Sequence, residues 1–448
     1  MAILIRREQG FYRRLMKLSM PIVLQNLITF SLGLIDTFMV SQLGNTEMAA
    51  VTAANVPVFL LISIVFGVQS GLGILVSQYW GKQNMKSISR SIGVASFVGA
   101  AVATVLAAVL FFWPVQIMDL LSNNHQLSIL GAPYLKIIGI SYIFNMLSSV
   151  YASAQRSAEN PSFGMKLFGA STLINTGLNY LLIFGHGGLP ALGVQGAAVA
   201  SVAAQVVSCL LVYLFLAVRL RQKQWRLRFT LGFTRPELLT CAKILLPLLA
   251  SEFLWSLGEN VYSAIYGNIG TQACAAMTMT TPIQCLMVGA LSGLSKAAAI
   301  LIGKSLGTQE YDRAYRDSQR LMRCGLATSL VLSALLLVFG RLYTTIYRVE
   351  PEVRATAYLL LVVFAVISPV KVQNMILGGG ILKSGGKTNY TLAIDLIGTW
   401  GFGVPLGLAA FVLKLPVVPV YFLLSLEECV RLALSLRLFK KRSWMQQL

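Results

Sequence analysis

Charged residues are scarce in this chain, and acidic residues are the scarcest of them. Only 12% of the 448 residues are charged, 56% are hydrophobic, and the mean hydropathy is +0.72. Soluble domains carry about a quarter of their residues as Asp, Glu, Lys and Arg. A soluble domain of this length could not bury so much apolar surface, so we expect an integral membrane protein.

The residues and motifs on which catalysis usually depends are also missing. The chain has two histidines, His125 and His186, and both lie in segments that we expect outside the apolar spans. No Gly-x-x-x-x-Gly-Lys-Ser/Thr motif is present, which argues against ATP as the direct energy source. The six cysteines have no paired spacing, so neither a disulfide framework nor a zinc site is indicated. We therefore expect neither an enzyme nor a cofactor.

Twelve apolar segments are long enough to cross a bilayer. A spanning helix needs about 20 apolar residues, and the sequence predicts such helices at 18–41, 52–78, 92–114, 131–153, 163–185, 193–218, 244–267, 276–302, 321–340, 356–380, 390–412 and 416–438. The first segment is too long for a cleavable signal peptide and lacks a small-residue cleavage site, so we expect it to be retained. The predicted fold class is an all-α integral membrane protein with 12 transmembrane helices.

Basic residues gather on one side of these segments. With the N-terminus placed in the cytoplasm, 28 Lys and Arg residues fall on the cytoplasmic side and five outside. The positive-inside rule then predicts an even number of spans with both termini in the cytoplasm. The same rule accounts for the net charge of +20 without a nucleic-acid partner, since no nucleic-acid-binding motif accompanies the charge. We expect a multi-pass protein of a bacterial cell membrane.

The second half of the chain repeats the first at a constant difference in residue number, which we call the repeat offset. Identical residues fall on one another without a gap near the ends of apolar segments: Pro21 on Pro247, Gly44 on Gly270, Gly81 on Gly307 and Arg90 on Arg316. We predict an N-lobe at 1–218, a cytoplasmic linker at 219–243 and a C-lobe at 244–448. Each lobe has six spans that start inside, so a pseudo-two-fold axis should run along the membrane normal. Tandem repeats of this kind are typical of transporters.

Polar residues inside the spans of the N-lobe are the first candidates for function, because such residues are costly unless paired or hydrated. Asp36, in the outer half of the first span, could exchange a proton, or bind Na⁺ if other oxygen ligands converge on it. Asn175 and Asn179 share one helix face, and Ser201 of the next span could join them. The alternatives are a carboxylate satisfied by water at the membrane interface, and amides that only hold helices together.

A second set of polar residues lies in the spans of the C-lobe. Its members are Glu252, Glu259, Gln284, Lys296, Lys371, Asn374 and Asp395. One interpretation is that the acids and lysines form ion pairs, which would let them stay in the membrane. The other is that they line a polar cavity that meets a substrate. Glu427 and Arg431 are four residues apart in the last span, which indicates a local ion pair.

The order and spacing of several motifs resemble the multidrug and toxic compound extrusion (MATE) family over nearly the whole chain. The motifs are Asp36-Thr37 with Gly44, Trp80-Gly81-Lys82-Gln83-Asn84, Asn160-Pro161, Asn175-x-x-x-Asn179, Gly193-Val194-x-Gly196, Gly303-Lys304-x-x-Gly307 and Gly380-x-x-Lys383-Ser384-Gly385-Gly386. The resemblance implies two six-helix lobes that face each other in a V and rock between outward-open and inward-open states. It also implies export of bulky, amphipathic, often cationic compounds in exchange for Na⁺ or H⁺.

The resemblance also assigns roles to individual residues. In the family, a first-span Asp, two polar residues of the fifth span and a Thr or Ser of the sixth form the cation site of the N-lobe. These positions match Asp36, Asn175, Asn179 and Ser201. If the ion is Na⁺, Asp36 and Asn179 are the expected ligands. Glu259 matches an acidic residue of the seventh span that some members use.

Two departures from the family pattern keep a second function open. Some members carry an acidic residue in the tenth span, where this chain has Lys371 and Asn374, and Lys296 makes the C-lobe still less anionic. The alternative is a flippase or exporter of a lipid-linked or other anionic amphiphile in the same superfamily; an intramembrane enzyme or receptor is a third reading. We expect a transporter that acts as a monomer, with the bilayer and a small amphipathic organic substrate as its partners.

Overall fold

The regular structure of the protein is helical. The computed structural model describes residues 2–121, 125–221, 232, 234–347 and 349–448, and this part of the chain contains no strand. The first half forms α1 (Ala2–Ser41), α2 (Asn45–Gly81), α3 (Met85–Phe112), α4 (Pro114–Leu121), α5 (His125–Ser157), α6 (Pro161–Phe184), the 3-10 segment η1 (His186–Gly188) and α7 (Gly193–Arg221). The all-α prediction is confirmed.

The second half forms a similar series of helices, with two short π-helical segments. It comprises α8 (Arg235–Ile269), α9 (Thr271–Gly307), α10 (Tyr311–Thr345), α11 (Pro351–Ile376), η2 (Leu377–Leu382), α12 (Thr388–Asp395), η3 (Leu396–Gly403), α13 (Val404–Val412), α14 (Val417–Ser425) and α15 (Glu427–Lys440). Of the predicted linker 219–243, residues 222–231 and 233 lie outside the described residues.

The described chain has eleven helices long and apolar enough to cross a membrane, and they correspond to the first eleven predicted spans. The twelfth predicted span, 416–438, is present as α14 and α15, which meet at Leu426. Two carboxylates, Glu427 and Glu428, directly follow this junction, and Arg431 lies one turn beyond them. This span is therefore helical, but the break at Leu426 divides it into helices of 9 and 14 residues, each too short to cross a bilayer alone.

The helices group into two compact units. Unit 1 contains Met1–Val23, Ser77–Gln83 and Leu246–Leu448, and unit 2 contains Leu24–Val76 and Asn84–Leu245. These units follow the two halves of the chain except where α1, α2 and α8 pass from one unit to the other within a single helix. The predicted C-lobe, 244–448, begins within α8 close to the point where that helix passes between the units, whereas the predicted N-lobe, 1–218, contains the whole of α1 and α2.

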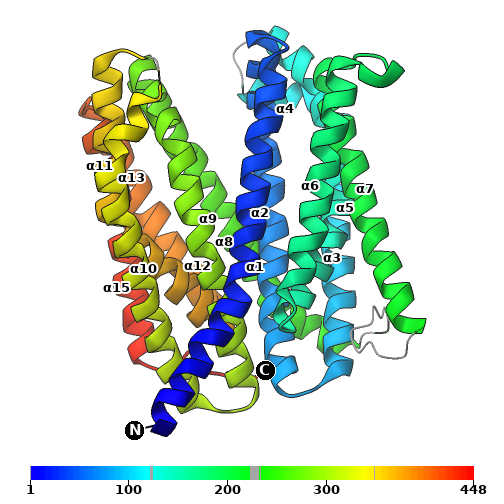
Figure 1. The fold of residues 1–448 in the computed structure, drawn as a ribbon, viewed down its shortest axis with the longest axis vertical. Helices are drawn as coiled ribbons and strands as arrows, with labels where there is room; N and C mark the ends of the chain where they lie inside the picture. The colour runs from blue at the N-terminus through cyan, green and yellow to red at the C-terminus, as the bar shows by residue number, and fades with distance from the viewer. Residues whose placement is uncertain (1, 122–124, 222–231, 233, 348) are drawn as a thin grey trace. The chain divides into compact units, whose positions relative to one another are not determined.

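Unit 2 is organised around α5, which packs against α3, α6 and α7 (Figure 1). Its core includes Leu135 and Ile138 of α5 together with Ala197 and Ala198 of α7. A Cβ atom at Gly196 would lie 2.6 Å from the carbonyl oxygen of Leu182, so this glycine allows α7 to approach α6 closely. The close approach brings the polar faces of α6 and α7 together.

Unit 1 has a core formed by α9, α10 and α11, which pack against one another (Figure 1). Its helices α11 and α12 continue into the π-helical segments η2 and η3. Such π-helical turns occur often at functional sites. A Cβ atom at Gly398 of η3 would lie 2.5 Å from Cγ of Arg431, so this segment leaves room for a large basic side chain.

The turns that follow α2 and α9 show the internal repeat in atomic detail. Gln83 and Gln309, which correspond at the repeat offset, both have a positive φ, of 57° and 61°. The backbone N–H of Gln83 donates to the carbonyl oxygen of Trp80, and the backbone N–H of Gln309 donates to the carbonyl oxygen of Leu306. Because Trp80 and Leu306 also correspond at this offset, the two turns share the same hydrogen bond in the register found in the sequence.

Candidate functional site

The carboxylate of Asp36 in unit 2 is surrounded by neutral hydrogen-bond donors. Thr176 Oγ1 donates to Asp36 Oδ1 over 3.0 Å. The amide orientation of Asn175 that satisfies its neighbours places Nδ2 2.9 Å from Asp36 Oδ2 and Oδ1 3.2 Å from Ser201 Oγ. The Asn179 side chain also hydrogen-bonds to Asp36. Within the described chain, no basic residue pairs with this carboxylate.

The helix geometry explains why these groups meet. Asn175 and Thr176 lie one turn before Asn179 on α6, and both are its neighbours because residues three and four apart adjoin on a helix. Asn179 is buried, and its Oδ1 has no hydrogen-bond partner in the described chain. A buried acceptor without a partner calls for an explanation such as a water or an ion. Carboxylate, hydroxyl and amide oxygens around Asp36 could hold a small hard cation, and the carboxylate could alternatively take up a proton.

The structure thus brings together all four residues that the sequence proposed for the N-lobe: Asp36, Asn175, Asn179 and Ser201. Their role in binding an ion remains a prediction. Thr176 was missed, although its position three residues before Asn179 on the same helix could have revealed it.

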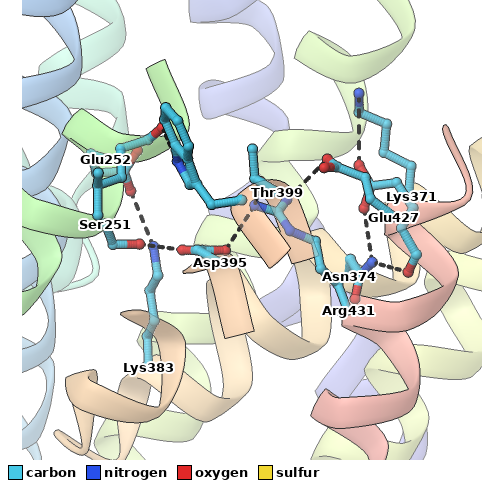
Figure 2. Close-up of polar contacts among 12 residues, drawn as sticks. Ser251, Glu252, Lys371, Asn374, Lys383, Asp395, Thr399, Glu427 and Arg431 are labelled. Carbon is cyan, nitrogen blue, oxygen red and sulfur yellow. Dashed lines mark hydrogen bonds and ion pairs between the residues drawn. The ribbon is translucent and has the colours of Figure 1, made fainter. Parts of the chain in front are cut away.

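The charged residues of unit 1 form a connected cluster instead (Figure 2). Lys383 Nζ lies 3.1 Å from Glu252 Oε1, and Arg431 Nη2 lies 3.0 Å from Asp395 Oδ1. The hydroxyl of Ser251 donates to the same Asp395. These contacts connect α8 with α12 and α15. Glu252 and Asp395 are therefore ion-paired, as one interpretation expected, but their partners are Lys383 and Arg431 rather than the predicted Lys296 and Lys371.

A second part of the same cluster lies around α15 (Figure 2). Arg431 Nη1 lies 4.0 Å from Glu427 Oε1, its Nη2 donates to Thr399 over 3.0 Å, and Tyr262 donates to Glu427. The predicted local pair of Glu427 and Arg431 is therefore present. Lys371 Nζ lies 3.9 Å from Glu428 Oε1, and Oε2 of the same carboxylate accepts from Asn374 Nδ2 over 2.8 Å.

The remaining candidates of the second half differ in their surroundings. Gln284 accepts from Tyr421 over 3.1 Å and donates to Thr280 over 3.0 Å, which indicates a packing role. Lys296 is half-buried on α9. Glu259 is half-buried and interacts electrostatically with Lys371, Glu428 and Arg431, but no described residue forms an ion pair with it. Lys383, which falls between the predicted spans 356–380 and 390–412, belongs to the buried cluster.

The chain matches a known family over most of its length. The sequence profile of the MatE family matches residues 21–181 and again residues 247–409. The chain belongs to the MatE family. The two matches begin at Pro21 and Pro247, the same pair of prolines that correspond at the repeat offset, so the MatE profile independently shows the repeat. The resemblance drawn from the motifs is confirmed, and with it the assignment to a family of membrane transporters.

Relatives and solved structures agree with this assignment. The chain is 24% identical to the "Uncharacterized transporter YisQ" of Bacillus subtilis, over 97% of this chain and 95% of the relative. It is also 24% identical to the "Probable multidrug resistance protein NorM" of Haemophilus ducreyi, over 88% of this chain and 85% of that protein. A crystal structure of the Vibrio cholerae MATE transporter VcmN superimposes with a TM-score of 0.86 at 19% identity, covering 98% and 99% of the two chains. This likeness shows that the MatE fold is shared.

Proposed function

We propose that the protein is a cation-coupled antiporter, driven by H⁺ or Na⁺, that exports amphipathic, cationic organic compounds by alternating access. It would act in a bacterial cell membrane with both termini in the cytoplasm. The observation that carries the proposal is the Asp36 carboxylate, which is held by neutral donors without a basic partner in the described chain.

The absence of an ion pair matters because a coupling site must change its charge during each cycle. Asp36 can gain or lose a cation without breaking a salt bridge, whereas Glu252 and Asp395 would first have to leave Lys383 and Arg431. A ligand shifts a conformational equilibrium only by its difference in affinity for the two states. In the proposed cycle, a cation at Asp36 supplies this difference and couples ion entry to substrate exit.

The charge of the unit 1 cluster supports a cationic substrate. The cluster contains five carboxylates and three basic groups, which gives a formal charge of −2 when all are ionised. The acids are Glu252, Glu259, Asp395, Glu427 and Glu428, and the basic residues are Lys371, Lys383 and Arg431. Several relatives are named as multidrug resistance proteins, which fits the export of organic compounds. Because Lys371 and Lys383 both lie beside carboxylates, the cluster gives little support to an anionic amphiphile.

The test uses purified protein in liposomes that contain a fluorescent organic cation, with Na⁺ and pH gradients imposed separately. Wild-type protein should export the dye under one of the two gradients. Asp36→Asn should abolish the response to that gradient, because the amide carries no charge for the ion to neutralise. An Asp36→Asn protein that is folded and exports at the wild-type rate would show that the coupling site lies elsewhere.

A further inference from the structure

A line of polar side chains runs through unit 2 from the Asp36 site. Asn175 connects Asp36 to Ser201, as described above. Gln205 lies one turn after Ser201 on α7, and its Oε1 accepts from Asn145 Nδ2 of α5 over 3.1 Å. The hydroxyl of Ser149, one turn further along α5, donates to Asn145 Oδ1 over 3.4 Å.

The line continues to the end of α5. Ser153 lies one turn after Ser149, and its hydroxyl donates to the carbonyl oxygen of Gln69 over 2.9 Å. Arg156 Nη2 then donates to the side-chain oxygen of Gln69 over 3.1 Å. Each step from Asp36 to Arg156 is therefore a hydrogen bond or a single helical turn, which separates side chains by about 5–6 Å.

Two further hydroxyls add to this polar surface. Ser148 and Ser208 follow Asn145 and Gln205 by three residues, and both are fully buried. The hydroxyl of Ser208 has no hydrogen-bond partner in the described chain, and that of Ser148 lies beside the thiol of Cys209. Buried water commonly satisfies such groups. On the predicted topology, this hydratable path leads from the outer half of the membrane to the cytoplasmic end of α5. We call it the polar path.

Arg156 stands at the cytoplasmic end of the polar path as a buried cation. Its side chain is only 8% exposed, and no carboxylate of the described chain forms an ion pair with it. The corresponding turn of the second half carries Lys383, which is paired with Glu252. At the repeat offset, the residue that falls on Glu252 is Asn26, so the first half lacks the acid at this position.

We propose that Arg156 is an electrostatic barrier that closes the cytoplasmic end of the polar path, so that the coupling cation cannot leak from Asp36 without transport. The inference rests on the proposed role of Asp36. An arginine is an effective barrier to cations and protons in membrane pores, because its charge is permanent and weakly screened when buried. A carboxylate beside Arg156 would neutralise its charge and so weaken the barrier. This explains why the first half has no acid at the position of Glu252.

The barrier is tested by the cation leak into protein-containing liposomes without organic substrate, under an imposed Na⁺ or pH gradient. Arg156→Gln should raise the leak by about tenfold or more, which corresponds to a lowering of the barrier by about 1.4 kcal/mol. Arg156→Lys, which keeps the charge, should leak as little as wild type. Lys166→Gln is the matched control. Lys166 is an exposed basic residue near the start of α6, the helix that follows α5, so this variant also removes one positive charge.

A second variant tests the barrier without removing the arginine. Gln69→Glu places a carboxylate within reach of Arg156 and retains the hydrogen-bond acceptor, so it should leak like Arg156→Gln even if that variant folds poorly. Combining either variant with Asp36→Asn should return the leak to the wild-type level, because the path then starts at a site that binds no cation.

Two results would overturn the barrier: folded Arg156→Gln and Gln69→Glu proteins that are as tight as wild type, or a leak that persists with Asp36→Asn. These results differ from a failure of the proposed function, which would appear as normal ion-driven export by Asp36→Asn alone. A tight Arg156→Gln protein whose export still depends on Asp36 would therefore refute only the barrier.

Discussion

Carboxylates in the two units are stabilised in different ways. Asp36 is held by the hydroxyl of Thr176 and the amide of Asn175, both neutral groups. Glu252 is held by the charge of Lys383, at 3.1 Å. Hydrogen bonds from neutral donors allow a carboxylate to be neutralised by an incoming cation, whereas a buried ion pair fixes both charges in place. The first arrangement suits a site that loads and unloads, and the second suits a permanent connection between helices.

The pair of Lys383 and Glu252 should therefore contribute mainly to stability. Lys383→Met leaves a carboxylate without its partner, which typically destabilises a protein by about 3–5 kcal/mol. Replacing both residues, as Lys383→Met with Glu252→Leu, should recover most of this loss. Thermal unfolding in detergent measures the effect, with Lys440→Met at an exposed position as control. Equal stability of the single variant and the control would show that the pair contributes nothing.

The candidate residues could be predicted individually, but their partners could not. Asp36 and Asn179 stand out because they are polar groups within apolar spans. No local pattern indicates that Lys383 pairs with Glu252, which lies on a helix from a distant part of the chain. Its neighbours Gly385 and Gly386 are typical of a turn, and Lys383 falls between two predicted spans rather than inside one. Pairing of this kind depends on how the helices pack, which hydropathy and spacing do not encode.

Among the elements of unit 1, the C-terminal ends of α2 and α9 approach each other closely through small residues. Gly303 contacts Ser77, and a Cβ atom at Gly307 would collide with the carbonyl oxygen of Gln78. The side chain of Gln78 is fully buried there and donates to the carbonyl oxygen of Ser384 over 2.7 Å. Small residues four apart are a common device for close helix packing in membranes.

Gly307→Ala should separate these two helix ends. The added methyl group meets backbone rather than a flexible side chain, so the helices must move, and overpacking typically costs about 1–3 kcal/mol. Gly169→Ala is the matched control, because a Cβ atom there meets nothing within 4 Å. Unfolding in detergent should show a loss for Gly307→Ala and none for Gly169→Ala. If the two variants were equally stable, the close packing would be irrelevant to stability.

The long helices were predictable because length and hydropathy alone determine whether a segment can span a bilayer. The irregular elements were not. Helices α11 and α12 pass into the π-helical segments η2 and η3, and the last span is divided at Leu426. In η3, Gly403 leaves space for Tyr262 and Glu427, so the irregularity accompanies contacts from distant parts of the chain. Such contacts lie beyond the reach of hydrophobic periodicity.

At the scale of the whole molecule, the two halves share a plan but carry different polar groups. The MatE profile matches both halves in the same register, and the turns at Gln83 and Gln309 have the same hydrogen bond. The first half keeps Asp36 among neutral donors, and the second half concentrates eight charged side chains in one cluster. A duplicated chain can thus divide ion coupling and substrate recognition between its halves.

Glu259 tests this division, because it is the carboxylate of the cluster without an ion-pair partner in the described chain. Glu259→Gln should raise the half-saturating concentration of a monovalent organic cation by about tenfold, the factor that corresponds to about 1.4 kcal/mol. Export should still respond to the same Na⁺ or pH gradient as in wild type, because Asp36 is intact. An uncharged amphiphile serves as the control substrate, and its half-saturation should not change. If Glu259→Gln instead abolished the response to the gradient while cation binding was retained, the coupling ion would have to bind in the second half.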